Sequence, residues 1–206
     1  MTTEKNKITW AILCTGWGRN AKDILKEHFK KNALSCSEFP VLIYEDDPCG
    51  AATYAKTKGV AVYQVKRSSF SSLESYQQHL LKLLAPYKVN FVFMLNFKYL
   101  LKQAFLSTYP DRIINIHPSL FPSFLATKTA VQDALEYGVK ITGITTHIID
   151  DKFDRGIILR QKAIRIPDGS TFDSLYPKFR KKGKKIILET IELIENTELK
   201  TFQKNG

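Results

Sequence analysis

The sequence lacks the features that mark membrane-bound or exported proteins. No segment approaches the continuous run of about 18 or more apolar residues that a membrane-spanning helix needs. The N-terminal stretch MTTEKNK is polar and contains no apolar core of a signal peptide. Since 44% of the residues are nevertheless hydrophobic, the chain can bury a sizeable core. We expect a soluble cytoplasmic protein that folds as a single domain over residues 1–206.

Metal ligands are also scarce. The three cysteines, Cys14, Cys36 and Cys49, are an odd number without metal-ligand spacing, and the first two lie in or beside apolar runs. The four histidines are scattered and form no HExxH or His-x-His cluster. We therefore expect reduced thiols and no bound metal.

The chain has 20 acidic residues against 31 lysines and arginines, which gives a formal net charge of +11 at pH 7. The densest basic stretch is KFRKKGKK at 178–185. No recognised nucleic-acid motif accompanies it, and lysines spread along a helix usually form a solvated face. We do not expect a nucleic-acid partner, because a positive field suits a small anionic substrate equally well.

Short apolar runs in the first half predict strands that are buried on both faces, as in a parallel sheet. These runs are ITWAILC (8–14), FPVLIY (39–44), VAVYQV (60–65), VNFVFML (89–95) and RIINIH (112–117). Residues 21–29 and 71–86 instead have apolar side chains at helical spacing, which makes His28 a packing residue. The pattern predicts an α/β fold, a Rossmann-like open, mostly parallel twisted sheet with helices on both faces.

The second half continues the alternation after an irregular loop. A helix is predicted over 127–137, ending at Gly138, and strands over 139–150 and 156–167. A C-terminal helix is predicted to begin near Ser170, where Ser-x-x-Asp forms a capping signal.

Asparagine and histidine stand together where the run at 112–117 ends. Side chains two apart on a strand share a face, so Asn115 and His117 should both point into the cleft at the carboxyl ends of the strands. An amide donor beside a titratable donor suits the stabilisation of an oxyanion in acyl transfer. A carboxylate would orient the imidazole, and the candidates are Asp150, Asp151 and Asp154. By spacing alone, a buried histidine and a solvated acidic turn explain the pattern equally well.

The turn TGWGRN (15–20) follows the first predicted strand and opens the first helix. Backbone amides and the helix dipole at such a turn can hold a phosphate. The third glycine of GxGxxG is missing, so a dinucleotide is poorly supported, and a plain tight turn fits nearly as well.

Two longer segments, NIHPSLFPSF (115–124) and ALEYGVKITGITTHIIDDKFDRGIIL (134–159), make the sequence recognisable. It resembles the folate-dependent formyltransferases, and the joint pattern of NxHPSL with DxxxDxG is highly specific. The resemblance implies transfer of a formyl group from 10-formyltetrahydrofolate to a primary amine, without a metal, by a monomer or homodimer. Those members that formylate glycinamide ribonucleotide in purine synthesis are the favoured comparison.

The resemblance also implies roles for particular residues. The catalytic residues would be Asn115, His117 and Asp154. The folate would lie against Tyr99, Leu101, Asp150, Asp151 and Asp154. The acceptor, a phosphorylated small-molecule amine, would be bound by Gly18, Arg19, Asn20 and Asn96. His147, on a predicted strand, would be structural.

Departures from the family pattern lie mostly on the acceptor side. Gly183 stands where the ribonucleotide-specific members have a glutamate, and Ala126 where they have a glycine. Arg19 replaces their usual serine, which is compatible with a phosphate. Two alternatives therefore stay open. One is an N-formyltransferase for another amine, such as an amino sugar or a metabolite, and the other is a folate- or nucleic-acid-binding protein without turnover.

Overall fold

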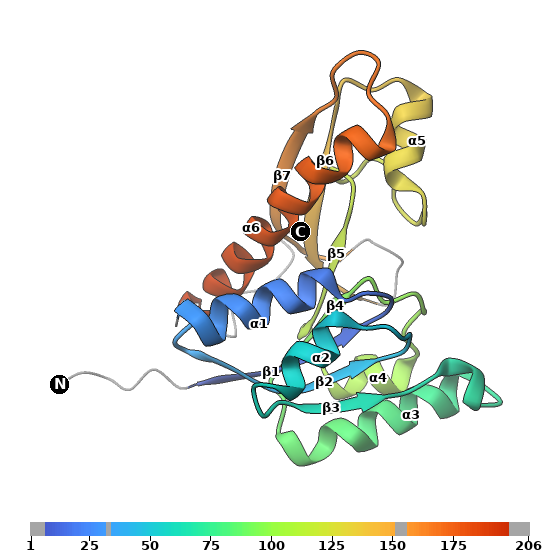
Figure 1. Ribbon diagram of the computed structural model, residues 1–206. Helices are drawn as coiled ribbons and strands as arrows, with labels where there is room; N and C mark the ends of the chain where they lie inside the picture. The colour runs from blue at the N-terminus through green and yellow to red at the C-terminus, as the bar shows by residue number, and fades with distance from the viewer. Residues whose placement is uncertain (1–6, 32–33, 151–155, 198–206) are drawn as a thin grey trace.

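The computed structural model describes residues 7–31, 34–150 and 156–197, and these build one seven-stranded sheet (Figure 1). Its strands are β1 (Ile8–Cys14), β2 (Ser37–Tyr44), β3 (Ala61–Gln64), β4 (Phe91–Leu95), β5 (Ile113–His117), β6 (Ile141–Ile148) and β7 (Ile158–Arg165). They are arranged in the order β3-β2-β1-β4-β5-β6-β7. Pairing is parallel from β3 to β5, whereas β6 runs antiparallel to both of its neighbours.

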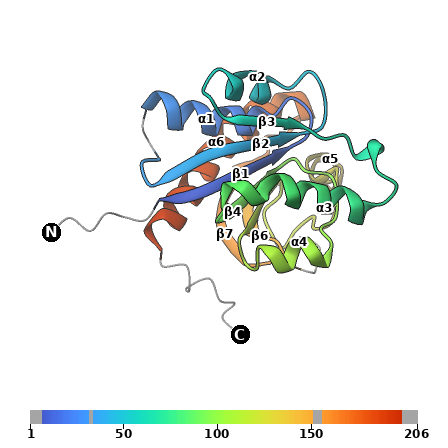
Figure 2. The same cartoon turned by 90° about the horizontal axis from the view of Figure 1, so that it is seen from below.

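Helices cover both faces of this sheet. They are α1 (Arg19–Lys31), α2 (Gly50–Lys56), α3 (Leu73–Leu84), α4 (Gln103–Thr108), α5 (Ala130–Tyr137) and α6 (Phe172–Asn196), with 3-10 turns at Arg67–Ser69 and Ala85–Tyr87. Alternate side chains of β1 enter opposite cores, Trp10 and Ile12 on the side of α1 and α6, Ala11 and Leu13 on the side of α3 and α4. Figure 2 shows these two helical layers on either side of the strands. The predicted fold class is confirmed.

Some predicted elements differ from the observed ones. Helices α2 and α4 were not predicted, because seven and six residues are too few to display a helical period. The C-terminal helix is capped by Thr171, whose hydroxyl accepts from the backbone amide of Ser174, and not by Ser170. In the part of the chain that is described, no helix has the length and apolar character needed to cross a membrane.

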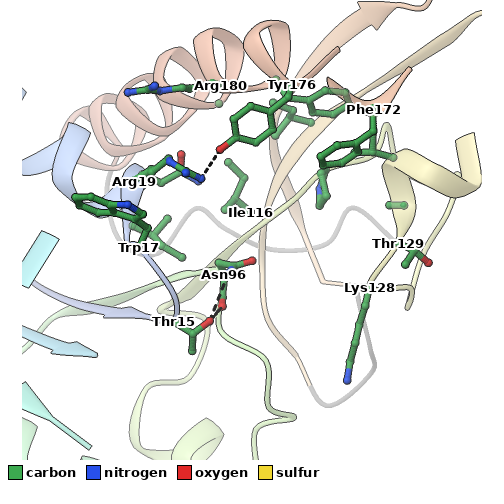
Figure 3. Close-up of a pocket in the computed structure, with 18 of the residues that line it drawn as sticks. Thr15, Trp17, Arg19, Asn96, Ile116, Lys128, Thr129, Phe172, Tyr176 and Arg180 are labelled. Carbon is green, nitrogen blue, oxygen red and sulfur yellow. Dashed lines mark hydrogen bonds between the residues drawn. The ribbon is translucent and has the colours of Figure 1, made fainter. Parts of the chain in front are cut away.

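The strand order reverses between the neighbouring strands β1 and β4. After β1 the chain adds strands toward one edge of the sheet, and after β4 it adds strands toward the other edge. In such sheets the loops diverge at the reversal and leave a crevice outside the carboxyl ends of the strands. Here the crevice lies between the turn after β1 and the loop after β4. The hydroxyl of Thr15, in that turn, donates to the carbonyl oxygen of Asn96, in that loop, and fixes the two relative to each other (Figure 3).

Candidate active site

The end of β5 presents Asn115 and His117 to a cavity of about 310 Å³, and both residues line it as predicted. His117 is 6% exposed, and its Nε2 lies 2.9 Å from the carbonyl oxygen of Phe124. Because a carbonyl oxygen only accepts hydrogen bonds, Nε2 carries the proton in this contact. The imidazole therefore gains a second donor only when Nδ1 is protonated as well.

Figure 3 shows a second cavity, of about 420 Å³, which shares lining residues with the first. The turn after β1, the end of β4, the start of α5 and one face of α6 form its wall. All four residues predicted to hold the acceptor line it, namely Gly18, Arg19, Asn20 and Asn96. The residues that line both cavities are Asn96, Ile116, Pro118 and Lys128. The two cavities are therefore neighbours that share part of their walls.

The turn before α1 is shaped by close packing. Gly18 has a φ of +66°, and a Cβ atom there would lie 2.7 Å from the Cβ of Ala51, so only glycine fits. The backbone amide of Gly16 donates to Oδ2 of Asp46 at 2.9 Å. This hydrogen bond, assisted by Lys98 and opposed by partial burial, holds the pKa of Asp46 below its usual value. The turn presents the positive end of the α1 dipole to the 420 Å³ cavity.

The charged side chains in the described wall of the 420 Å³ cavity are all positive. Arg19, Lys128 and Arg180 belong to it, and its described lining residues include no aspartate or glutamate. Arg19 is held in place, since its Nη1 donates to the hydroxyl of Tyr176 at 2.7 Å and its guanidinium lies 5.6 Å from that ring (Figure 3). This cavity favours an anionic ligand.

The predicted folate-side residues are placed in part. Tyr99, Leu101 and Asp150 line the 310 Å³ cavity together with the predicted pair on β5. Asp151 and Asp154 lie outside the described residues. The structure thus brings two of the three predicted catalytic residues to one cavity, and the role of Asp154 stays a prediction.

Helix α6 contributes more to the 420 Å³ cavity than Gly183, the position on that helix that the family resemblance placed on the acceptor side. Phe172, Tyr176, Phe179 and Arg180 line the 420 Å³ cavity alongside Gly183. Their spacing of three and four residues places them on one face of a helix, and this signal was available in the sequence. Only the fold shows that this face of α6 and the turn before α1, about 150 residues earlier, line the same cavity.

Comparisons with known proteins identify similar chains. The sequence profile of a family described as formyl transferase matches residues 8–191. The phosphoribosylglycinamide formyltransferase of Mycobacterium tuberculosis (strain H37Rv) is 30% identical over 183 residues, which cover 87% of this chain and 81% of that protein. The crystal structure of phosphoribosylglycinamide formyltransferase from Bacillus halodurans superposes with a TM-score of 0.86 at 29% identity, covering 95% of this chain and 100% of that one. Glycinamide ribonucleotide transformylase 1 from Symbiobacterium toebii gives a TM-score of 0.87 at 27% identity, over 95% and 91% of the two chains.

Proposed function

The chain belongs to the formyl transferase family, and from this premise we propose that it transfers a formyl group to the amine of glycinamide ribonucleotide in purine synthesis. The names of the similar proteins support this acceptor. The observation that carries the proposal is the pair of adjoining cavities, one lined by Asn115 and His117, the other by residues 18–20. Two substrates that react with each other need sites in such contact.

We assign the formyl donor, 10-formyltetrahydrofolate, to the 310 Å³ cavity. This volume lies at the lower end of the range of about 300–1,000 Å³ for small-molecule pockets. Phe97 and Tyr99 supply aromatic surface, and Asn115 and Asp150 supply polar side chains, a combination that suits a flat ring with polar edges. When bound, this co-substrate supplies the formyl group in an activated form.

The chain's own residues would stabilise the charge that develops during transfer. As an amine attacks a formyl carbon, negative charge grows on the formyl oxygen, and Asn115 and His117 are the proposed donors to it. Loss of one such donor costs about 3–4 kcal/mol in other enzymes. Since His117 Nε2 already donates to Phe124, the imidazolium form would provide the further donor. We assign to Asp154 the task of favouring that form and of helping to pass the proton that the amine releases to the folate nitrogen, whose bond to the formyl carbon breaks as tetrahydrofolate leaves.

The acceptor would occupy the 420 Å³ cavity. Its phosphate is assigned to the backbone amides of Gly18, Arg19 and Asn20, at the positive end of the α1 dipole. Arg19 and Arg180 add positive charge beside that position. The amine would then point toward the shared wall at Asn96 and Ile116, next to Asn115.

The test is turnover by the purified protein. With 10-formyltetrahydrofolate and glycinamide ribonucleotide, we expect release of tetrahydrofolate and a formylated ribonucleotide, detected by absorbance and by mass spectrometry. His117→Ala should lower kcat at least about 100-fold. The proposal is wrong if the wild-type protein binds the folate yet formylates no amine in a panel of acceptors.

One observation favours an alternative acceptor, a phosphorylated amine other than glycinamide ribonucleotide. The described wall of the 420 Å³ cavity contains no carboxylate, and Gly183 contributes no side chain, so ribose hydroxyl groups would meet only neutral side-chain acceptors there, such as those of Asn20 and Gln132. Amino-sugar phosphates should be included in the panel. A higher kcat/KM for one of them than for glycinamide ribonucleotide would favour this alternative.

A further inference from the structure

The loop between β4 and α4 is held by a buried glutamine. Gln77 lies on α3 and is 2% exposed. Its Nε2 donates to the carbonyl oxygen of Leu100 at 2.7 Å, and its Oε1 accepts from the backbone amide of Lys102 at 2.8 Å. These two hydrogen bonds bracket Leu101 and satisfy backbone groups that irregular structure would otherwise leave unpaired. One side chain thus sets the backbone path of the segment that lines the 310 Å³ cavity.

A buried carboxylate holds the same loop through a side chain. Glu45 follows β2 and is 8% exposed, and its Oε1 accepts from the hydroxyl of Tyr99 at 2.6 Å and from the backbone amide of Arg67 at 3.1 Å. Burial and the hydrogen bond to Glu45 raise the pKa of Tyr99 to about 12, so its hydroxyl remains a donor at neutral pH. The ring also packs edge-on against Phe97, with 5.4 Å between the centroids.

Retaining this carboxylate has a cost. Oε2 of Glu45 is buried and finds no hydrogen-bond partner among the described residues. A buried acceptor without a partner is destabilising, so packing alone does not favour glutamate at this position. Departures of this kind are expected where a residue serves a site.

We propose that Gln77 and Glu45 are positioning residues that fix loop 97–102 for folate binding, an inference that rests on the proposed function. Neither residue lines either cavity, so both would act through the loop. Tyr99 and Leu101, which they hold, line only the 310 Å³ cavity. Weakening the loop should therefore affect binding of the folate and leave binding of the acceptor unchanged.

The first test compares two glutamines that are adjacent on α3. Gln77→Met keeps the length of the side chain and removes both hydrogen bonds, while Gln78→Met changes an exposed neighbour. For Gln77→Met we expect KM for 10-formyltetrahydrofolate to rise about 10-fold, kcat to change less than about 3-fold and KM for the acceptor to stay the same. The Glu45 variants described next, which act on the same loop, serve as the test if Gln77→Met does not fold.

The second test uses a conservative rescue. Glu45→Leu removes the acceptor for Tyr99 and should raise the folate KM. Glu45→Gln retains an acceptor oxygen, so its folate KM should stay close to that of the wild-type protein. If Glu45 had a purely structural role, Glu45→Leu would lower the melting temperature without raising the folate KM relative to the acceptor KM. An unchanged folate KM in both Gln77→Met and Glu45→Leu, or an equal rise in both KM values, overturns the proposal.

Binding of tetrahydrofolate, measured by calorimetry, separates this inference from the proposed function. If wild-type protein formylates no amine but Gln77→Met weakens the binding of tetrahydrofolate about 10-fold relative to Gln78→Met, the loop inference holds and only the reaction is wrong. If wild-type protein turns over glycinamide ribonucleotide and both variants bind tetrahydrofolate equally, only the loop inference is wrong.

Discussion

The side-chain amide nitrogen of Asn115 lies 3.4 Å from Nε2 of His147, and Nδ1 of the same imidazole lies 3.1 Å from the carbonyl oxygen of Ile148. The carbonyl only accepts, so Nδ1 carries the proton and Nε2 accepts from Asn115. His147 is 1% exposed and pairs with Asn115 across β5 and β6. It therefore fixes which way the amide of Asn115 faces.

Substitution of His147 by phenylalanine should reduce turnover through Asn115. His147→Phe keeps a ring beside Phe121, whose centroid is 5.0 Å away, and removes the acceptor. We expect kcat to fall about 10- to 100-fold, because a small misplacement of a catalytic group is costly. In a double-mutant cycle with Asn115→Ala, the two losses should be far from additive. Additive losses would show that His147 does not act through Asn115.

The sequence predicted those parts of the site that depend on local pattern. A few neighbouring residues are enough to encode the strand ends and the glycine turn at 15–20. The same is true of the period of two that places Asn115 and His117 on one face of their strand. Contacts between segments that are distant in the sequence could not be predicted from any such local pattern. Glu45 meets Tyr99 and Gln77 meets Leu100 only because β2, α3 and β4 are brought together by the fold.

The loop after His117 shows the same limit. Ala126 has a φ of +55° and Phe124 a φ of +54°, values that favour glycine. No rule based on composition predicts a left-handed backbone at an alanine or a phenylalanine, because local preference opposes it. The conformation of this loop is therefore imposed by its surroundings, which include the hydrogen bond between Phe124 and His117.

Gly183 should tolerate a methyl group. A Cβ atom there would lie 3.7 Å from Ile144 Cδ1 and 3.9 Å from Asn20 Oδ1, both ordinary contacts, and the residue lies inside α6. Since glycine in a helix costs about 1 kcal/mol relative to alanine, Gly183→Ala should raise the melting temperature by about 2–4 °C. Gly138→Ala is the matched control, because its φ of +77° should make the same change destabilising. Thermal unfolding followed by circular dichroism measures both, and a lower melting temperature for Gly183→Ala would contradict the prediction.

Asp46 should contribute stability that is lost in acid. Its pKa in the folded protein lies below its usual value of about 3.9, chiefly because of the Gly16 amide. A depressed pKa gives stability that is present above the unfolded pKa and disappears as the pH falls through the folded pKa. Because the side chain is 44% exposed, we expect Asp46→Asn to cost no more than about 1 kcal/mol at pH 7 and much less near pH 2. Urea unfolding at the two pH values measures this, and a pH-independent difference would contradict it.

Arg19 should determine affinity for the phosphate of the acceptor. Arg19→Met keeps much of the apolar length but removes the charge, and the loss of one charge-assisted hydrogen bond corresponds to a KM about 10-fold higher for glycinamide ribonucleotide. Tyr176→Phe, which removes only the hydroxyl that accepts from Arg19 at 2.7 Å, should raise that KM by about 3-fold. The folate KM should stay unchanged in both variants, since neither residue lines the 310 Å³ cavity. Steady-state kinetics with each substrate varied in turn measure these constants, and an acceptor KM that is unaffected by Arg19→Met would show that the Arg19 side chain does not bind the phosphate.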